Sequence, residues 1–298
     1  MKRCAAGIAL CVLSSLLLVA GCKHSPRPKD TAASPRIVTF SPSLTDLMFD
    51  MGMGDHVVGA ASQSDVPPDR NIPIVGDEQT VNTETVLIAR PDVLLVQSDP
   101  KLFVRVCEGD SNIRMEHFVL NKTEDIALAA ERIARIAGHE DVGKKTAAAF
   151  LSDLTAIRRK ADGKPHPRVL FVRDYKQPYA AGRNTLLNEM IQIAGGTNVA
   201  AERWEGWAAV NAEHIMAVHP DGLICLATPD EAQQAREYWA DVKGLPASQK
   251  GRVFVVSDPN WLHSSTRLAK ITALLAEMIH SAPASAPVPT STSKGASE

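Results

Sequence analysis

The sequence predicts an α/β protein of two lobes, each a mostly parallel sheet flanked by helices, joined by one long helix. Three observations predict it. The chain has 298 residues, 45% of them hydrophobic, which is enough for one large or two medium cores. A strand–helix pattern occurs twice in the same order, as expected of a duplicated parallel sheet. A long stretch without proline, rich in helical periodicity, lies between the two copies.

The clearest repeat compares VNTETVLIARPDVLLV (residues 81–96) with VNAEHIMAVHPDGLIC (residues 210–225). In each copy Asn caps a short helix, Glu lies in its first turn, Pro-Asp ends it, and an apolar strand follows. Upstream, PRIV (residues 35–38) matches PRVL (residues 167–170), and both should open a buried strand. Between these segments each copy has a helix ending at glycine, within residues 45–59 and 187–201. A repeat this long, present twice, predicts a duplicated lobe.

Two helices are predicted between the copies. Apolar residues at helical spacing span residues 124–137, where Gly138 ends the helix, and again residues 140–161. The second helix would extend about 30 Å, long enough to lie along both lobes.

The N-terminus predicts export and lipidation. Lys2 and Arg3 precede an apolar run over residues 5–20, as in a secretory signal. The run ends in LVAGC, which resembles the lipobox of bacterial lipoproteins and implies cleavage before Cys22 and acylation of its thiol. Acyl chains would hold the chain to the cell envelope, in the periplasm or at the outer face of the membrane. The alternatives are an ordinary signal peptide with a chance cysteine, or an uncleaved anchor.

The flanks are Pro-, Ser- and Lys-rich, and they predict a flexible tether and a disordered tail. The predicted organisation is a signal peptide (1–21), a tether (22–34), a first lobe (35–122), a helical linker (123–163), a second lobe (164–280) and a tail (281–298).

The charge balance excludes one class of partner, and the cysteine positions indicate whether a disulfide is expected. Lys and Arg together number 32, and Asp and Glu together number 34. The chain therefore lacks the excess of basic residues that is typical of nucleic-acid-binding proteins. After cleavage only Cys107 and Cys225 remain in the folded part, in different lobes. Two buried thiols are expected there rather than a disulfide.

The order of these features resembles a known family. The lipobox, the duplicated lobes, the linking helix and the phrases RIVTFSPSLTDLMFDMGMGDHVVGA and AAGRNTLLNEMIQIAGGTNVA are similar to class III periplasmic substrate-binding proteins. These serve ABC importers of cobalamin, haem and iron–siderophore complexes. The resemblance implies a non-enzymatic protein without a cofactor. Its ligand, a metal chelate, would bind in the cleft between lobes, and it would dock on an ABC permease dimer.

The ligand site should lie beyond the carboxyl ends of the strands, where open α/β sheets bind their ligands. Tryptophan rings in these loops could cover a flat chelate, or they could be core plugs. Arg173 and Arg267 could pair with an anionic group of the ligand, and Arg267 could equally form an ordinary surface ion pair. Tyr175 and Tyr179 could stack on the ligand, donate a hydrogen bond or close their loop. The predicted ligand-binding residues are Ser41, Ser43, Ser64, Asp65, Tyr175, Trp204, Trp207, Trp261 and Arg267.

The three tryptophans in loops of the second lobe, Trp204, Trp207 and Trp261, favour cobalamin over haem or a ferric siderophore. One residue departs from that pattern, because Val66 stands where cobalamin-binding members tend to carry an aromatic side chain. The first lobe contains no tryptophan, so the second would supply most of the stacking.

Glu84 and Glu213 occupy equivalent positions in the two copies. The resemblance implies that they form salt bridges with arginines of the permease dimer, one from each lobe. They also suit the first turn of a helix, where a carboxylate complements the helix dipole, and the two roles are compatible.

Enzyme and metal signatures are not found in the sequence. There is no GxSxG elbow or GxxxxGK[ST] loop, and His139-Glu140 lacks the second His of HExxH. The histidines are dispersed without ligand spacing, so no metal site is predicted. An enzyme or sensor anchored in the envelope is the alternative of a different class.

Overall fold

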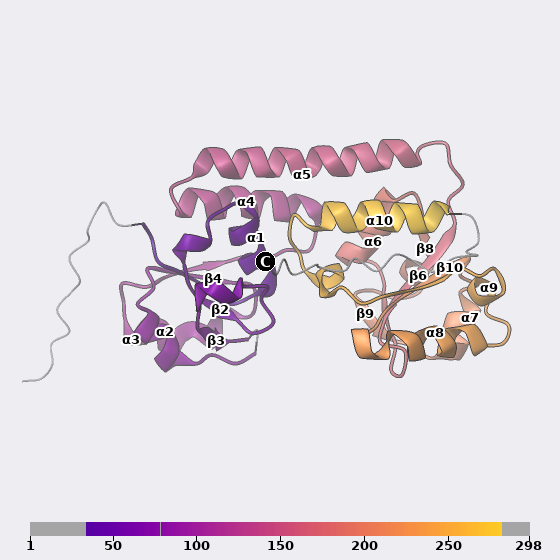
Figure 1. Ribbon diagram of the computed structural model, residues 1–298, viewed down its shortest axis with the longest axis horizontal. Coiled ribbons are helices and arrows are strands. Elements are labelled where there is room, and N and C mark those ends of the chain that lie inside the picture. The colour runs from indigo at the N-terminus through magenta and orange to yellow at the C-terminus, as the bar shows by residue number, and fades with distance from the viewer. Residues whose placement is uncertain (1–33, 78, 282–298) are drawn as a thin grey trace, which may run out of the picture. The chain divides into compact units, whose positions relative to one another are not determined.

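A computed structural model describes residues 34–77 and 79–281 of the chain. The predicted signal peptide, Cys22, the tether up to residue 33 and the tail beyond Ser281 lie outside these residues. Helix and strand labels follow Figure 1.

The first lobe is built on a five-stranded, wholly parallel sheet in the order β3-β2-β1-β4-β5. Its helices are α1 (Pro42–Asp50), α2 (Thr83–Ala89) and α3 (Val104–Gly109). The strands are β1 (Ile37–Thr39), β2 (Val57–Ala61), β3 (Ile74–Gly76), β4 (Val93–Val96) and β5 (Arg114–His117). A parallel sheet buried on both faces explains why β4 is apolar at every position.

The second lobe has a six-stranded sheet that is only partly parallel. Its path is β11-β10-β6-β7-β9, with β8 also pairing with β6, and β7 runs antiparallel to β6 and β9. The strands are β6 (Arg168–Arg173), β7 (Tyr179–Ala181), β8 (Thr197–Asn198), β9 (Trp207–Ala209), β10 (Gly222–Leu226) and β11 (Val253–Val256). The helices are α6 (Leu186–Ile193), α7 (Ala212–Ala217), α8 (Ala232–Asp241), α9 (Pro246–Gln249) and α10 (Leu268–His280).

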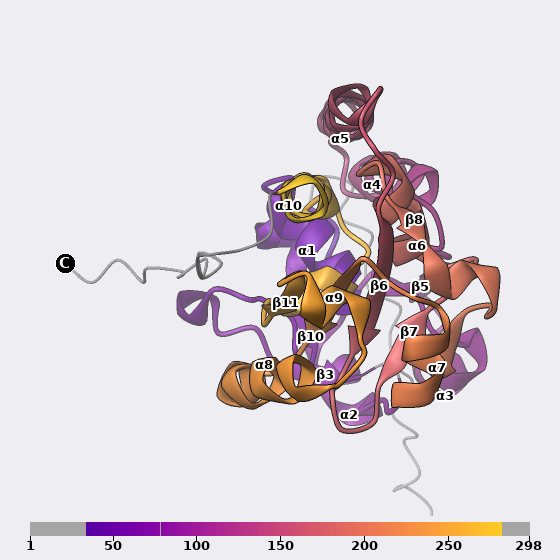
Figure 2. The same ribbon diagram turned by 90° about the vertical axis from the view of Figure 1, so that its right-hand side faces the viewer.

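Helices α4 (Thr123–Ile136) and α5 (Glu140–Ala161) connect the lobes, close to the predicted bounds. They pack side by side, and Figures 1 and 2 show both on one side of the sheets. Helix α4 contacts α1 of the first lobe, and α5 contacts α6 and α10 of the second. This arrangement confirms the predicted two-lobed α/β fold with a long linking helix.

The hydrophobic core ties the lobes together. One continuous cluster contains side chains of β1 and α1, of α4 and α5, and of β6, α6 and α10. Each of two further hydrophobic clusters lies within a single lobe, and we call it the private core of that lobe. Because protein interiors are close-packed and resist deformation, a shared core favours lobes that move little relative to each other.

The duplication is visible in the helix caps. The side chain of Asn82 accepts a hydrogen bond from the Thr85 amide at the start of α2, and Asn211 accepts one from the His214 amide at the start of α7. Each cap satisfies an amide that the first turn of a helix would otherwise leave unpaired.

The Pro-Asp segments are equivalent in detail. Asp92 Oδ2 accepts from the Arg36 amide (2.8 Å), and Asp221 Oδ2 from the Arg168 amide (3.0 Å). The guanidinium of each arginine donates in turn to a carbonyl at the end of α2 or α7. In each lobe, hydrogen bonds between the arginine of Pro-Arg and the aspartate of Pro-Asp therefore connect the first strand to the end of the neighbouring helix.

Both cysteines among the described residues are free thiols. Cys107 is half-buried on α3, Cys225 is buried on β10, and burial raises the pKa of Cys225 to about 11. None of the helices among residues 34–77 and 79–281 has the length and apolar character needed to cross a bilayer.

Candidate ligand-binding site

An aromatic ladder begins in the core and ends at the surface of the second lobe. The buried Trp261 ring stacks on Phe171 of β6 at 5.7 Å, and Phe171 meets Trp207 of β9 edge-on at 6.2 Å. Trp261 is 1% exposed, whereas Trp207 is 41% exposed. The ladder therefore holds its outer ring in place through rings fixed in the core, and it leaves that outer ring available to a ligand.

The Arg173 guanidinium lies at the outer end of the ladder. It sits 5.0 Å from the Tyr179 ring and 5.8 Å from the Trp207 ring, within cation–π range of both. Alternation along β6 puts Arg173 on the same face as Phe171. Arg173 is exposed and forms no ion pair with a carboxylate of the described residues, so its charge remains available.

A pocket of about 350 Å³ adjoins this surface. It is lined by Lys176–Tyr179, Ala209–Ala212 and Tyr238, so the Tyr179 ring borders both the pocket and the ladder. The volume is at the lower end of the range for small-molecule sites.

Two predicted ligand residues lie on the opposite face of this sheet. Tyr175 is 7% exposed, packs in the private core of the second lobe and donates its hydroxyl to Gln234 Oε1 at 3.0 Å. Trp204 is half-buried against the same core, beside His214 of α7. Both rings pack with Leu170 and Val172 of β6, whose side chains point to the face opposite that of Phe171.

Trp261 also differs from the prediction. Its loop follows β11 as expected, but the ring is a core plug beneath Phe171. Its contribution to a ligand would be indirect, through the position of Phe171 and Trp207.

The predicted serines are engaged inside the protein. Ser41 Oγ donates to Gln97 Oε1 (2.7 Å), and Ser43 Oγ accepts from the Ser264 amide (2.8 Å). Ser64 Oγ contacts Thr45 Oγ1 at 3.0 Å. Ser41 and Ser43 are buried, so in this conformation they organise the strand ends rather than face solvent.

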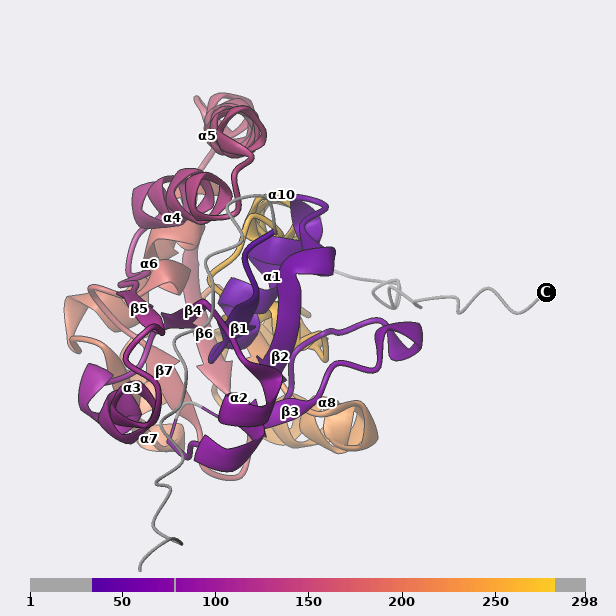
Figure 3. The ribbon, with the colours of Figure 1, turned by 90° about the vertical axis from the view of Figure 1, so that its left-hand side faces the viewer.

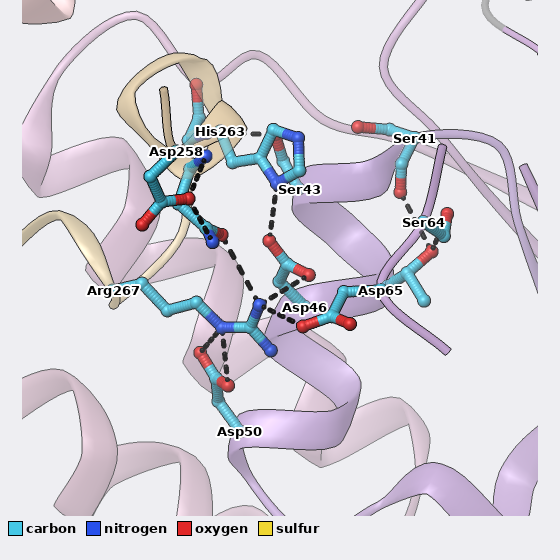
Figure 4. Close-up of polar contacts among 12 residues, drawn as sticks. Ser41, Ser43, Asp46, Asp50, Ser64, Asp65, Asp258, His263 and Arg267 are labelled. Carbon is cyan, nitrogen blue, oxygen red and sulfur yellow. Dashed lines mark hydrogen bonds and ion pairs between the residues drawn. The ribbon is translucent and has the colours of Figure 1, made fainter. Parts of the chain in front are cut away.

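Arg267 and Asp65 meet at the junction of the two lobes (Figure 4). The guanidinium contacts three carboxylates of the first lobe, at 3.2 Å from Asp46, 3.0 Å from Asp50 and 3.0 Å from Asp65. Asp46 is fully buried, and its Oδ2 atom also lies 2.8 Å from His263 Nδ1, within hydrogen-bond distance.

The charge balance of this cluster disfavours an anionic ligand. Burial lowers the pKa of Arg267, but the Asp46 and Asp50 charges outweigh burial and raise that pKa above its ordinary value. Three carboxylates exceed the charge of one guanidinium even when His263 is protonated. Arg267 is therefore an internal ion-pair partner here, and Arg173 is the cation that an anionic group could reach.

Glu84 and Glu213 are both exposed, in the first turns of α2 and α7. Neither forms an ion pair with a described residue. Figure 3 shows α2 and α7 on the side of the sheets away from α5.

The histidines are less dispersed than the sequence predicts. His56 Nε2 and His139 Nε2 lie 3.3 Å apart, and His56 Nδ1 contacts the Pro35 carbonyl oxygen at 3.0 Å. The contact is tertiary, between residues 83 positions apart, so sequence spacing could not reveal it. Residues 34–77 and 79–281 contain no group of three or more His, Cys, Asp or Glu side chains arranged to hold a metal.

Arg173 and Tyr179, which the sequence offers as possible ligand contacts, lie together at the outer end of the ladder because they pair across β6 and β7. Asp46 and Asp50 are the residues of the charged cluster that the sequence analysis missed. They are four residues apart on α1, a spacing that puts both carboxylates on one side of the helix.

The sequence profile of the Periplasmic binding protein family matches residues 37–259. The chain belongs to this family. It is a class III member, a substrate-binding protein of an ABC importer, and it is not an enzyme, so the alternative of an envelope enzyme is wrong. Family membership also indicates an extracytoplasmic location.

Two curated relatives show the extent of the similarity. The vitamin B12-binding protein of Salmonella choleraesuis is 26% identical over 216 residues, covering 72% of this chain and 80% of the relative. The ABC transporter substrate-binding lipoprotein YvrC of Bacillus subtilis is 25% identical over 309 residues, covering 92% of this chain and 97% of the relative.

Solved structures share the fold. The periplasmic haem-binding protein RhuT of Roseiflexus sp. RS-1 is 24% identical with a TM-score of 0.73, covering 83% of this chain and 98% of that one. The vitamin B12-binding protein BtuF of Vibrio cholerae is 20% identical with a TM-score of 0.72, covering 83% and 96%.

Proposed function

We propose that this protein captures a metal chelate between its lobes and delivers it to an ABC importer, with cobalamin as the first candidate. The observation that carries the proposal is the exposed end of the aromatic ladder, where Trp207 and Tyr179 flank the Arg173 guanidinium. A flat chelate can cover such rings by stacking and apolar contact. The curated relatives named vitamin B12-binding proteins support cobalamin.

Haem is the second candidate, and Arg173 is the observation that favours it. Haem carries two carboxylates, with which an unpaired guanidinium can form charge-assisted hydrogen bonds. Cobalamin carries one phosphodiester and mostly neutral amides. A ferric siderophore with carboxylate groups would use the same cation.

We infer that Glu84 and Glu213 dock on the permease. Both carboxylates are exposed and unpaired among the described residues, and they occur once in each lobe at equivalent positions. Two such charges suit a symmetric partner that presents one arginine to each lobe. We also propose that acyl chains on Cys22 hold the protein at the membrane.

Titration of the purified protein tests the ligand. Cyanocobalamin, haemin and a ferric siderophore all absorb where tryptophan emits, so each should quench fluorescence on binding near Trp207. Saturable quenching by cyanocobalamin at the lowest concentration is the expected result. Tighter quenching by haemin would replace cobalamin with haem, and no saturable quenching by any of the three would exclude the chelate proposal.

An arginine variant separates the two leading ligands. Arg173→Gln should weaken haemin binding by about tenfold or more, because a charge-assisted hydrogen bond contributes about 1.5–3 kcal/mol. Cyanocobalamin affinity should change much less. Equal losses for both ligands would show that the guanidinium acts through packing on the rings rather than through its charge.

A further inference from the structure

The strongest feature outside the ladder is the charged cluster at the lobe junction. It joins helix α1 and the loop of residues 62–67 in the first lobe to the segment of residues 258–267 in the second. These partners are separated by more than 200 residues in sequence. The proposed ligand surface at Trp207, Tyr179 and Arg173 does not include the cluster, and the net negative charge argues against an anion site. The contacts of this cluster across the lobe junction therefore suggest a structural role in positioning rather than in ligand binding.

We propose that Arg267 is a positioning residue that clamps the loop of residues 62–67 to the second lobe. Its guanidinium contacts carboxylates from two different elements at once. Nε faces Asp50 of α1 at 3.0 Å, and Nη1 faces Asp65 of the loop at 3.0 Å. A planar guanidinium with several fixed donors can bridge such partners, whereas an ammonium cannot hold the same geometry.

The anchor of the clamp is built into the protein interior. Asp46 is fully buried, and its two oxygens meet Arg267 Nη1 at 3.2 Å and His263 Nδ1 at 2.8 Å. Thr266 Oγ1 donates to Asp50 at 3.1 Å. The 258–267 segment is thus fixed to α1 by several contacts, so the guanidinium is already oriented before it meets Asp65.

The loop itself needs such a constraint. Gln63 has a φ of 64°, in the left-handed region that non-glycine residues rarely adopt. The side-chain contacts next to it are Ser64 with Thr45 (3.0 Å) and Asp65 with Arg267 (3.0 Å). A strained conformation of this kind persists only where its neighbours hold it, and these two contacts hold the two residues that follow Gln63.

The consequence follows from where the loop lies. It leaves the carboxyl end of β2, the edge of the first sheet at which an open α/β sheet binds its ligand. A clamp from the second lobe would fix the distance between this loop and that lobe in the free protein. The effect on ligand capture rests on the proposed function, but the clamp does not, so it is testable without any ligand.

Hydrogen exchange of the ligand-free full chain, measured by mass spectrometry, tests the clamp. In Arg267→Ala we expect amides of residues 62–66 and of residues 260–265 to exchange about tenfold faster, on both sides of the lobe junction. In Asp65→Asn, which removes one exposed carboxylate, only residues 62–66 should exchange faster, by a smaller factor. Arg267→Lys should restore part of the protection.

Arg168→Ala is the matched control. Arg168 forms a two-contact ion pair with Glu202 at 2.7 and 3.1 Å, but both residues belong to the second lobe. Its loss should leave residues 62–66 within twofold of the parent. Unchanged exchange in residues 62–66 of a folded Arg267→Ala or Asp65→Asn protein would overturn the proposal. So would a uniform rise across both lobes in Arg267→Ala without a local rise in Asp65→Asn.

Discussion

Trp207 and Trp261 occupy the two ends of one aromatic ladder, and their exposure assigns them different roles. Trp261 is 1% exposed and belongs to the core shared by both lobes, whereas Trp207 is 41% exposed. The same residue type therefore serves stability at Trp261 and leaves an accessible ring at Trp207.

Substituting each tryptophan separates these roles. Trp207→Ala should weaken binding of the ligand identified by titration by about thirty-fold, the equivalent of ~2 kcal/mol, because a stacked ring is lost. Its melting temperature should stay near that of the parent. Fluorescence-independent titration, such as calorimetry, is the appropriate measurement.

The control is Trp261→Ala. It should lower the free energy of unfolding by about 3–5 kcal/mol, since it removes a buried indole, and it should lower the melting temperature. If Trp207→Ala destabilised the fold as much and left affinity unchanged, the ladder would be structural at both ends.

At the scale of elements, α2 and α7 are equivalent helices with the same capping chemistry. Each begins with an asparagine cap and carries an exposed glutamate in its first turn. A first-turn carboxylate complements the helix dipole by about 0.3–1 kcal/mol, which explains the residue type without docking. The proposed docking would be a separate role of the same two exposed charges.

Charge reversal distinguishes docking from helix stability. The double variant Glu84→Lys/Glu213→Lys should abolish most ligand delivery in a reconstituted importer, because each Lys would face a permease arginine. Ligand affinity measured on the free protein should change little. The assay is ligand uptake into proteoliposomes that contain the permease and its ATPase.

Glu124→Lys provides the comparison for that variant. Glu124 is also an exposed glutamate in the first turn of a helix, α4, on the other side of the molecule. The same charge reversal there should leave uptake intact. A comparable loss of uptake in Glu124→Lys would refute docking through α2 and α7.

At the scale of the whole molecule, one hydrophobic cluster crosses both lobes and includes α5. Separating the lobes would expose part of this shared core, which costs about 25 cal/mol for each Å² of apolar surface. Ligand capture by this protein is therefore expected to involve small adjustments of loops and side chains rather than wide opening of the lobes.

The proposed membrane attachment concerns the whole chain and is tested at Cys22. Cys22→Ser should leave the protein unprocessed or release it into the soluble fraction of the envelope, because acyl chains alone would hold it. Fractionation of cells followed by immunoblotting measures this. A cleaved Cys22→Ser protein that stayed in the membrane fraction would contradict the lipoprotein proposal.

The fold could be predicted far better than the site. Helix α5 begins and ends at the residues predicted from apolar periodicity, and the caps at Asn82 and Asn211 follow from residue type and position. These features depend on a few neighbouring residues, so local sequence determines them. The two-fold repeat likewise predicted two α/β lobes, but it did not predict the antiparallel pairing of β7 with β6 and β9 in the second sheet.

Tertiary structure decided which side chains are free. Arg267 was a reasonable ligand residue by its loop, yet Asp46, Asp50 and Asp65 engage it from the other lobe. Arg173, at the carboxyl end of β6, keeps its charge available beside Trp207. Sequence spacing determines the face of a strand or helix on which a residue lies. Whether a charge or ring there is exposed depends on contacts between segments up to 221 residues apart, which only the folded chain brings together.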